Sequence, residues 1–146
     1  MRVRCVSLQY IVASRSKTVG SLTIGKEYVA LELLVMSDGA WVRVLTDQAD
    51  FDEGDLDHAI YPMTLFEVTD SKLSRRWQIA ADPEGNVSLG PPEWQSRDFW
   101  DRLFGDLPFV LGKPDVSAYG SFSLQTQALV EEDAASQSSP GDIPAR

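Results

Sequence analysis

Apolar and polar residues alternate along the first part of the chain, which is the pattern of half-buried strands. The alternation predicts strands at residues 3–6, 26–36 and 40–46. A leucine-rich run can also form a helix, but the Ser-Asp-Gly turn at residues 37–39 favours a hairpin between the second and third strands. In residues 26–36 we expect the odd positions to face the core, namely Val29, Leu31, Leu33 and Val35.

The next apolar runs predict further strands at residues 59–61 and 66–68, after a loop at 46–58. Residues 77–81 and 87–89 flank an Asp-Pro-Glu-Gly turn, so they are expected to form a second hairpin. The polar residues 14–21 are interpreted as a loop.

Pro91 and Pro92 end the strand pattern, and Ser96 or Asp98 can then cap a helix that runs to about Phe104. The helix would place its large apolar residues on one face, for packing on the sheet or for binding a partner; they are Phe99, Trp100, Leu103 and Phe104. Residues 113–130 are interpreted as weakly structured, either docked as a strand or loose. Residues 131–146 are rich in serine and acids and are predicted to be a disordered tail.

These elements predict an α+β fold that is mainly β, in a single globular domain spanning residues 1–112. Residues 22–70 resemble an SH3-like barrel, through the segments GKEYVALELL, MSDG, AWVRVLTD and AIYPMTLFEV. The resemblance implies a barrel over residues 1–70, followed by the hairpin and helix at 75–112. Ala40 and Leu65 stand where SH3 domains carry ligand-binding aromatics, and Pro62 remains. Binding of proline-rich peptides is therefore not expected.

The later stretch RRWQIAADPEGNVSLGPPEWQSRDFWDRLF is similar to small bacterial proteins of the toxin-immunity type and to neighbouring uncharacterised families. This resemblance implies a bacterial protein that binds and inhibits another protein.

Charge is unevenly distributed along the 146 residues, whose net charge is −9. Residues 1–45 carry six basic and three acidic side chains, whereas residues 46–58, here called the acidic loop, carry six acids and no base. The negative charge argues against nucleic acid as a partner. It is compatible with a solvated loop, or with a surface that docks on a basic protein.

The N-terminal apolar stretch is too interrupted for a signal peptide, and no window reaches the ~20 apolar residues of a membrane span. Cys5 is the single cysteine, so it cannot form an intrachain disulfide and is expected to be a small buried residue. We therefore expect a cytoplasmic protein without a membrane partner.

Candidate chemistry is sparse. In a calcium loop beginning at Asp50, Gly54 would fall at position 5 and Tyr61 at position 12, so the register fails and no metal site is predicted. His58 is the single histidine, and a solvated or capping role is its default interpretation. Phosphate and dinucleotide motifs are absent from the sequence, so no catalytic residue and no cofactor is predicted.

The leading hypothesis is a non-enzymatic protein-binding domain, an immunity-type inhibitor that docks through its acidic loop. The alternative is a small regulatory or scaffold domain that binds a peptide or small molecule through an aromatic surface. A carboxylate-dependent enzyme is the weakest class. Trp94 follows two prolines and is expected to be partly exposed. The candidate partner-binding residues are Asp50, Asp52, Glu53, Asp55, Asp57 and Trp94.

Overall fold

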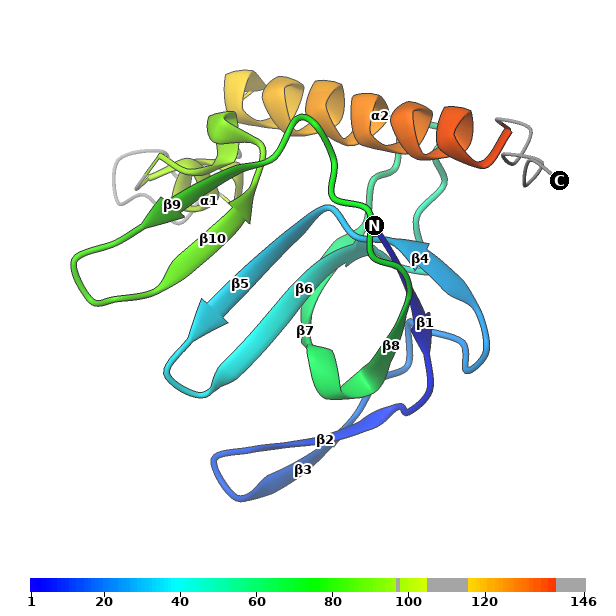
Figure 1. Cartoon of the computed structure of the whole chain (residues 1–146), viewed down its shortest axis with the longest axis vertical. Coiled ribbons are helices and arrows are strands. Elements are labelled where there is room, and N and C mark those ends of the chain that lie inside the picture. Colours follow the sequence, from blue (N-terminus) through cyan, green and yellow to red (C-terminus); the bar gives the residue numbers. More distant parts are fainter. Residues whose placement is uncertain (97, 105–115, 139–146) are drawn as a thin grey trace, which may run out of the picture.

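The computed structural model describes residues 1–96, 98–104 and 116–138. This part of the chain is mainly β, with antiparallel sheets and a long C-terminal helix that lies across one end of them (Figure 1). The predicted class is therefore confirmed at this level.

A three-stranded sheet contains the first strand in its centre. Its strands are β1 (Arg2–Cys5), β4 (Glu27–Val29) and β8 (Phe66–Asp70), in the order β4-β1-β8. Val3 pairs with Tyr28 on one side and Val68 on the other. Val3 and Cys5 are fully buried, as the alternation and the single cysteine predict, and burial raises the pKa of the Cys5 thiol.

A five-stranded sheet holds both predicted hairpins. Its strands are β5 (Glu32–Met36), β6 (Gly39–Leu45), β7 (His58–Pro62), β9 (Gln78–Ala81) and β10 (Val87–Gly90), in the order β7-β6-β5-β10-β9. Gly39, with φ +123°, closes the turn between β5 and β6, a conformation that a side chain would strain. Both hairpin predictions are confirmed.

The predicted single strand at residues 26–36 is wrong in two respects. Ala30 and Leu31 break it into β4 and β5, which belong to different sheets. Leu31 is buried as expected, but Val35 is 47% exposed, and the even residues Tyr28, Ala30 and Glu32 are buried. Ala30, Leu31 and Glu32 are consecutive and all buried, so the alternation is interrupted where the chain passes from one sheet to the other, and the odd-position rule holds for Leu31 but fails for Val35.

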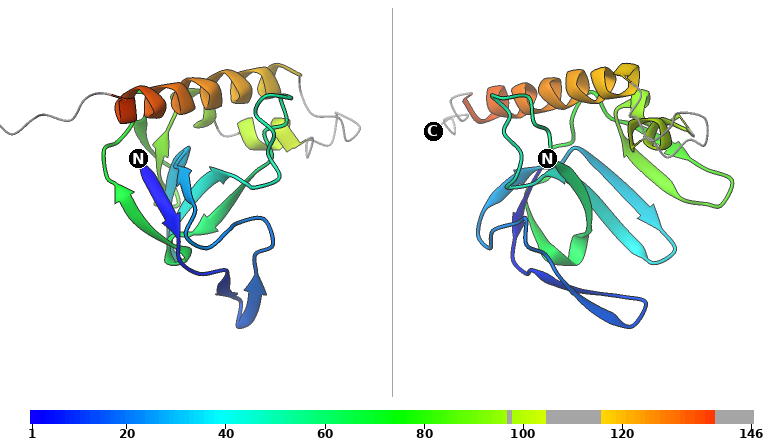
Figure 2. Two further views of the ribbon diagram at one scale, coloured as in Figure 1. Left: turned by 90° about the vertical axis from the view of Figure 1, so that its right-hand side faces the viewer. Right: turned by 180° about the vertical axis from the view of Figure 1, so that it is seen from behind.

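Residues 14–21 are not simply a loop, because β2 (Gln9–Val12) and β3 (Arg15–Thr18) form a separate hairpin. Its turn residues Ala13 and Ser14 both have positive φ, 49° and 63°. That conformation is normally supplied by Gly or Asn, which explains why the sequence gives no turn signal. The hairpin projects from the end of the molecule opposite the C-terminal helix (Figures 1 and 2).

Two short 3₁₀ helices, η1 (Met63–Leu65) and η2 (Pro92–Trp94), follow β7 and β10. The predicted helix near residue 98 is present as α1 (Phe99–Phe104). Phe99 and Leu103 are buried, whereas Phe104 is exposed, so the expected apolar face is only partly covered within the described structure.

The expectations for the C-terminal part are wrong over residues 116–138, which form the 23-residue helix α2 (Val116–Ser138). Residues 113–115 and 139–146 lie outside the described structure. The buried residues of α2 recur every three or four positions, which is the spacing of one helix face: Ala118, Phe122, Thr126, Leu129 and Asp133. Two of these five are polar, so the apolar periodicity that would reveal a helix is weak.

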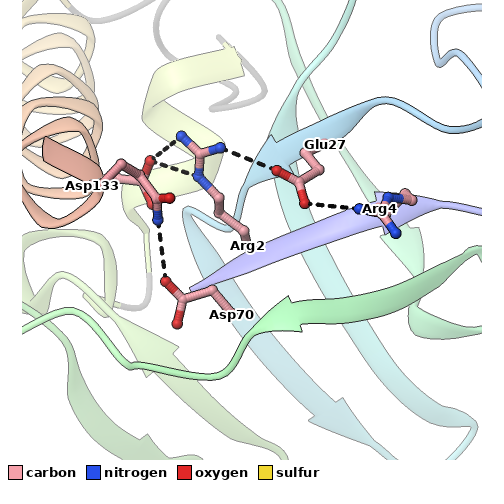
Figure 3. Close-up of polar contacts among 6 residues, drawn as sticks. Arg2, Arg4, Glu27, Asp70 and Asp133 are labelled. Carbon is pink, nitrogen blue, oxygen red and sulfur yellow. Dashed lines mark hydrogen bonds and ion pairs between the residues drawn. The ribbon is translucent and has the colours of Figure 1, made fainter. Parts of the chain in front are cut away.

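Ion pairs fix the C-terminal half of α2 to the β-strands (Figure 3). Arg2 Nε and Nη2 donate to Asp133 Oδ2 at 2.8 and 2.7 Å, and Arg2 Nη1 donates to Glu27 at 3.2 Å. Glu132 accepts hydrogen bonds from Ser74 and from the backbone N–H of Arg75. The predicted disorder of residues 131–138 fails because these polar side chains have partners far away in the sequence.

Candidate functional site

The acidic loop is folded rather than loose in its middle part. Asp50 and Asp55 exchange backbone hydrogen bonds of 2.8 Å in both directions, and Gly54 makes the turn with φ +76°. The Asp50 carboxylate accepts the backbone N–H of Glu53 at 3.1 Å. Tyr119 of α2 donates its hydroxyl to the Gly54 carbonyl at 2.9 Å, so the loop rises beside that helix (Figure 2).

Two acids at the ends of the loop are occupied by internal contacts. The Thr46 hydroxyl donates to Asp57, and Asp47 accepts hydrogen bonds from Lys26, Thr23 and Tyr28 at 2.6, 2.6 and 2.9 Å. Burial raises the pKa of Asp47, but these donors outweigh it and leave the pKa below its usual value. Burial also raises the pKa of Tyr28 to about 12. Asp47 and Asp57 therefore anchor the loop.

The remaining candidates form an exposed group. Asp52, Glu53 and Asp55 are exposed, and within the described part of the chain their carboxylates make no hydrogen bond. Among residues 1–96, 98–104 and 116–138 no group of three or more His, Cys, Asp or Glu side chains is arranged to hold a metal ion. The structure thus brings five of the six predicted site residues together in one loop and leaves three of them as an anionic tip.

Trp94, the sixth candidate, lies elsewhere and is not exposed. It is 1% exposed, and its ring centroid lies 5.1 Å from Phe122 and 5.6 Å from Trp100. The expectation of partial exposure is wrong because η2 turns the chain inward after Pro91, whose carbonyl accepts the Trp94 N–H at 3.0 Å. Trp94 Nε1 is buried and has no partner among the described residues.

His58 is partly buried among aromatic rings, so its expected solvated role is wrong. Its ring centroid is 4.2 Å from Phe122, 5.7 Å from Phe104 and 6.0 Å from Trp100. Burial and, to a smaller extent, the charge of Arg43 lower its pKa to about 4, against an opposing effect of Asp57. His58 is therefore neutral at pH 7.

Arg43 donates from Nη1 to Nδ1 of His58 at 3.1 Å, since a guanidinium has no acceptor. Its Nε donates to Glu32 Oε1 at 2.8 Å, and the guanidinium carbon lies 3.7 Å from the centre of the Trp100 ring. Burial raises the pKa of Glu32, with Arg43 opposing the shift. Sequence analysis missed this pair, although the predicted turn at Asp38 and Gly39 would have placed Glu32 opposite Arg43.

Glu32 also lines a groove of about 550 Å³. The groove lies between one face of β5, β10 and β9 and the segment from η2 into α1. It contains three acidic side chains, Glu32, Asp82 and Glu84, and no Lys or Arg among the described residues that line it. The lining residues are Glu32, Leu34, Ala80, Ala81, Asp82, Pro83, Glu84, Asn86, Val87, Ser88, Trp94, Gln95, Ser96 and Trp100.

Comparisons of this chain with protein-family models, curated proteins and solved structures gave no match. Across the described residues, no helix is both long enough and apolar enough to cross a membrane. The class that the structure defines is a mainly β domain with a C-terminal helix. Function must be argued from the acidic loop and the groove themselves.

Proposed function

We propose that this chain is a non-enzymatic protein-binding domain, a cytoplasmic inhibitor of the bacterial toxin-immunity type, whose acidic loop docks on a basic partner. One observation carries the proposal: the loop is held in a defined shape while Asp52, Glu53 and Asp55 remain free and exposed. A preorganised anionic surface speeds association with a cation-rich partner and loses less entropy on binding than a mobile one.

The aromatic surroundings of His58 and its lowered pKa support a binding role rather than catalysis. General acid–base catalysis at neutral pH is most efficient with a pKa near 7, whereas that of His58 is about 4. Its Nδ1 is occupied by Arg43 and its ring is stacked among aromatic side chains.

We further propose that residues 1–70 are an open variant of the SH3-like barrel. Support comes from β1 pairing with β8, from the tight β5–β6 hairpin, and from η1 between β7 and β8. The aromatic surface that binds proline-rich ligands in SH3 domains is not part of this proposal, because Ala40 and Leu65 stand at two of its aromatic positions.

The test uses the protein encoded by the adjacent reading frame, produced separately and mixed with this chain. The triple variant Asp52→Asn, Glu53→Gln, Asp55→Asn should slow association measured by stopped flow at low salt. It should also flatten the dependence of the association rate on ionic strength, because exposed charges act at long range and are screened. Asp50 and Asp57 stay unchanged because their carboxylates hold the loop together.

The matched control removes three acids outside the loop, through Glu93→Gln, Asp101→Asn and Glu131→Gln. It has the same net charge as the loop variant and should slow association less. Equal rates for the two variants would show that total charge, and not the loop, attracts the partner. Absence of a complex with the neighbouring protein would contradict the immunity-type proposal.

A further inference from the structure

The groove beneath α1 has a chemistry that the acidic-loop proposal does not use. Along its β-sheet side, Leu34 pairs with Ser88, and Ser88 pairs with Ala80. Directly opposed residues of antiparallel strands share a face, so this row forms one wall of the groove. Trp94 and Trp100 approach it from η2 and α1.

Glu32 provides a deep acceptor in this groove. It is 2% exposed, and Arg43 bonds its Oε1, which leaves Oε2 without a hydrogen bond among the described residues. Gly90 keeps the space beside it open, because a Cβ at that position would lie 2.8 Å from Glu32 Cβ and 3.3 Å from Oε2. Among the described residues Oε2 is not a fully enclosed atom without a partner, so it stays open to the groove and can accept a hydrogen bond from a donor there.

The charge of the groove favours a cation. Arg43 balances Glu32, and Asp82 and Glu84 at the tip of the β9–β10 hairpin then leave an excess of negative charge over the groove. Trp100 lines the groove and is only partly buried, and guanidinium groups combine planar donors for carboxylates with stacking on indole rings. Arg43 already makes this combination of contacts with Glu32 and Trp100 inside the protein.

We propose that the groove is a recognition pocket for an arginine side chain of the partner protein. The guanidinium donates to Glu32 Oε2 and its alkyl stem lies along the Leu34–Ser88–Ala80 row, with Asp82 and Glu84 at the entrance. This inference rests on the proposed function in one respect, that the chain binds a basic protein. It adds a specific pocket to the long-range attraction of the acidic loop.

The test titrates the full chain with Nα-acetyl-arginine amide and follows the indole N–H resonances by two-dimensional NMR. Saturable shifts are expected for Trp94 and Trp100, with little change for Trp77, which does not line the groove. Nα-acetyl-citrulline amide has the same shape without the charge and should bind at least roughly tenfold more weakly, since its loss of charge removes the ionic contact with the carboxylate. Nα-acetyl-lysine amide should bind between the two.

The obvious variant, Glu32→Gln, leaves Arg43 buried without its carboxylate and is expected to damage the fold. Ser88→Leu avoids this problem, because it fills the groove from β10 without touching the ion pair. It should weaken arginine amide binding roughly tenfold or more by occupying the space of the stem. Ser88→Ala is the matched control, since it removes the hydroxyl without filling the groove, and should bind nearly as the parent does.

Three results would overturn the pocket: no saturable shift with arginine amide, equal binding of the citrulline analogue, or parent-like binding by Ser88→Leu. The triple loop variant Asp52→Asn, Glu53→Gln, Asp55→Asn separates this inference from the proposed function. It should leave arginine amide binding unchanged while slowing association with the partner protein. If arginine amide fails to bind but the loop variant slows association with the partner, only the pocket is contradicted. If arginine amide binds but the loop variant associates as fast as the parent, only the docking role of the loop is contradicted.

Discussion

Arg43 and Glu32 face each other across β6 and β5, and the 2.8 Å bond between Arg43 Nε and Glu32 Oε1 is shielded from water. Their side chains are 7% and 2% exposed. Arg43 also reaches His58 and Trp100, so one guanidinium connects the sheet to the aromatic cluster under α1 and α2. A buried pair of this kind depends strongly on having both partners present.

Replacing one member of the pair should therefore be more harmful than replacing both. Arg43→Met is expected to lower the free energy of unfolding by about 3–5 kcal/mol, because Glu32 is left as an unpaired buried charge. The double variant Arg43→Met, Glu32→Met should recover most of that loss. Urea unfolding followed by fluorescence measures both.

Arg4→Met is the matched control for this experiment. Arg4 pairs with Glu27 and Glu67 at 3.3 and 3.0 Å but is 43% exposed, so its loss should cost less than about 1 kcal/mol. If the double variant is no more stable than Arg43→Met, the attraction between Arg43 and Glu32 exceeds the cost of removing both charges from water.

His58 makes stability depend on pH. Its pKa is about 4 in the folded chain against a reference of 6.5, so the unfolded state takes up the proton first as the pH falls. Neutral His58 therefore stabilises the folded state fully above pH 6.5. This stabilisation, about 3 kcal/mol in total, is lost as the pH falls from 6.5 toward 4. Glu32, whose pKa is raised, acts in the opposite direction.

Comparison with His58→Phe isolates the histidine, because phenylalanine keeps the stacking and cannot titrate. The stability difference between the parent and this variant should shift by about 2–3 kcal/mol against the parent between pH 7 and pH 4.5. Urea unfolding at several pH values gives this difference. Parallel curves for the two proteins would mean that His58 is not shielded as described.

Thr126 is a fully buried residue of α2 whose hydroxyl has no partner among the described residues. Thr126→Val replaces that hydroxyl by a methyl group of similar size and should raise the free energy of unfolding by about 1 kcal/mol. Thr64→Val, at an exposed position in η1, serves as the control and should change stability by less than about 0.5 kcal/mol. A destabilised Thr126→Val would indicate that the hydroxyl has a partner.

Asp133 ties α2 to β1, so Asp133→Asn should destabilise the fold by about 1–3 kcal/mol through the weakened bonds to Arg2. Removing residues 131–146 should lower the melting temperature further, because Glu132 and its bonds to residues 74 and 75 are lost as well. Glu131→Gln is the control for the point variant, since Glu131 is exposed and contacts Gln127 within the helix. An unchanged melting temperature on truncation would instead support the disorder that the composition suggests.

Turn chemistry explains which strands could be predicted from sequence. The β5–β6 and β9–β10 hairpins have Asp-Gly and Asp-Pro-Glu-Gly turns, and both were predicted. The β2–β3 hairpin turns at Ala13 and Ser14, which normally avoid positive φ. The sequence therefore does not predict this hairpin. The helix α2 was missed because Thr126 and Asp133 occupy its buried face.

The sequence predicts the negative charge of the candidate site, but it does not predict which of its side chains are occupied by tertiary contacts. The acidic composition of residues 46–58 identifies the loop directly. That Asp47 is internal depends on Lys26 and Tyr28, which approach it only through the tertiary structure. The burial of Trp94 likewise depends on Phe122 of a helix that the sequence pattern does not reveal.

The bonds between Arg2 and Asp133 join residues that are 131 positions apart. Ribosomes add about 5–20 residues per second, so the first strand is made on the order of ten seconds before its partner on α2 exists. The Phe122 ring that packs against Trp94 and His58 is likewise made after them, about one to ten seconds later at this rate. A nascent chain therefore presents this aromatic surface to chaperones and proteases, and synthesis of the last helix ends that exposure.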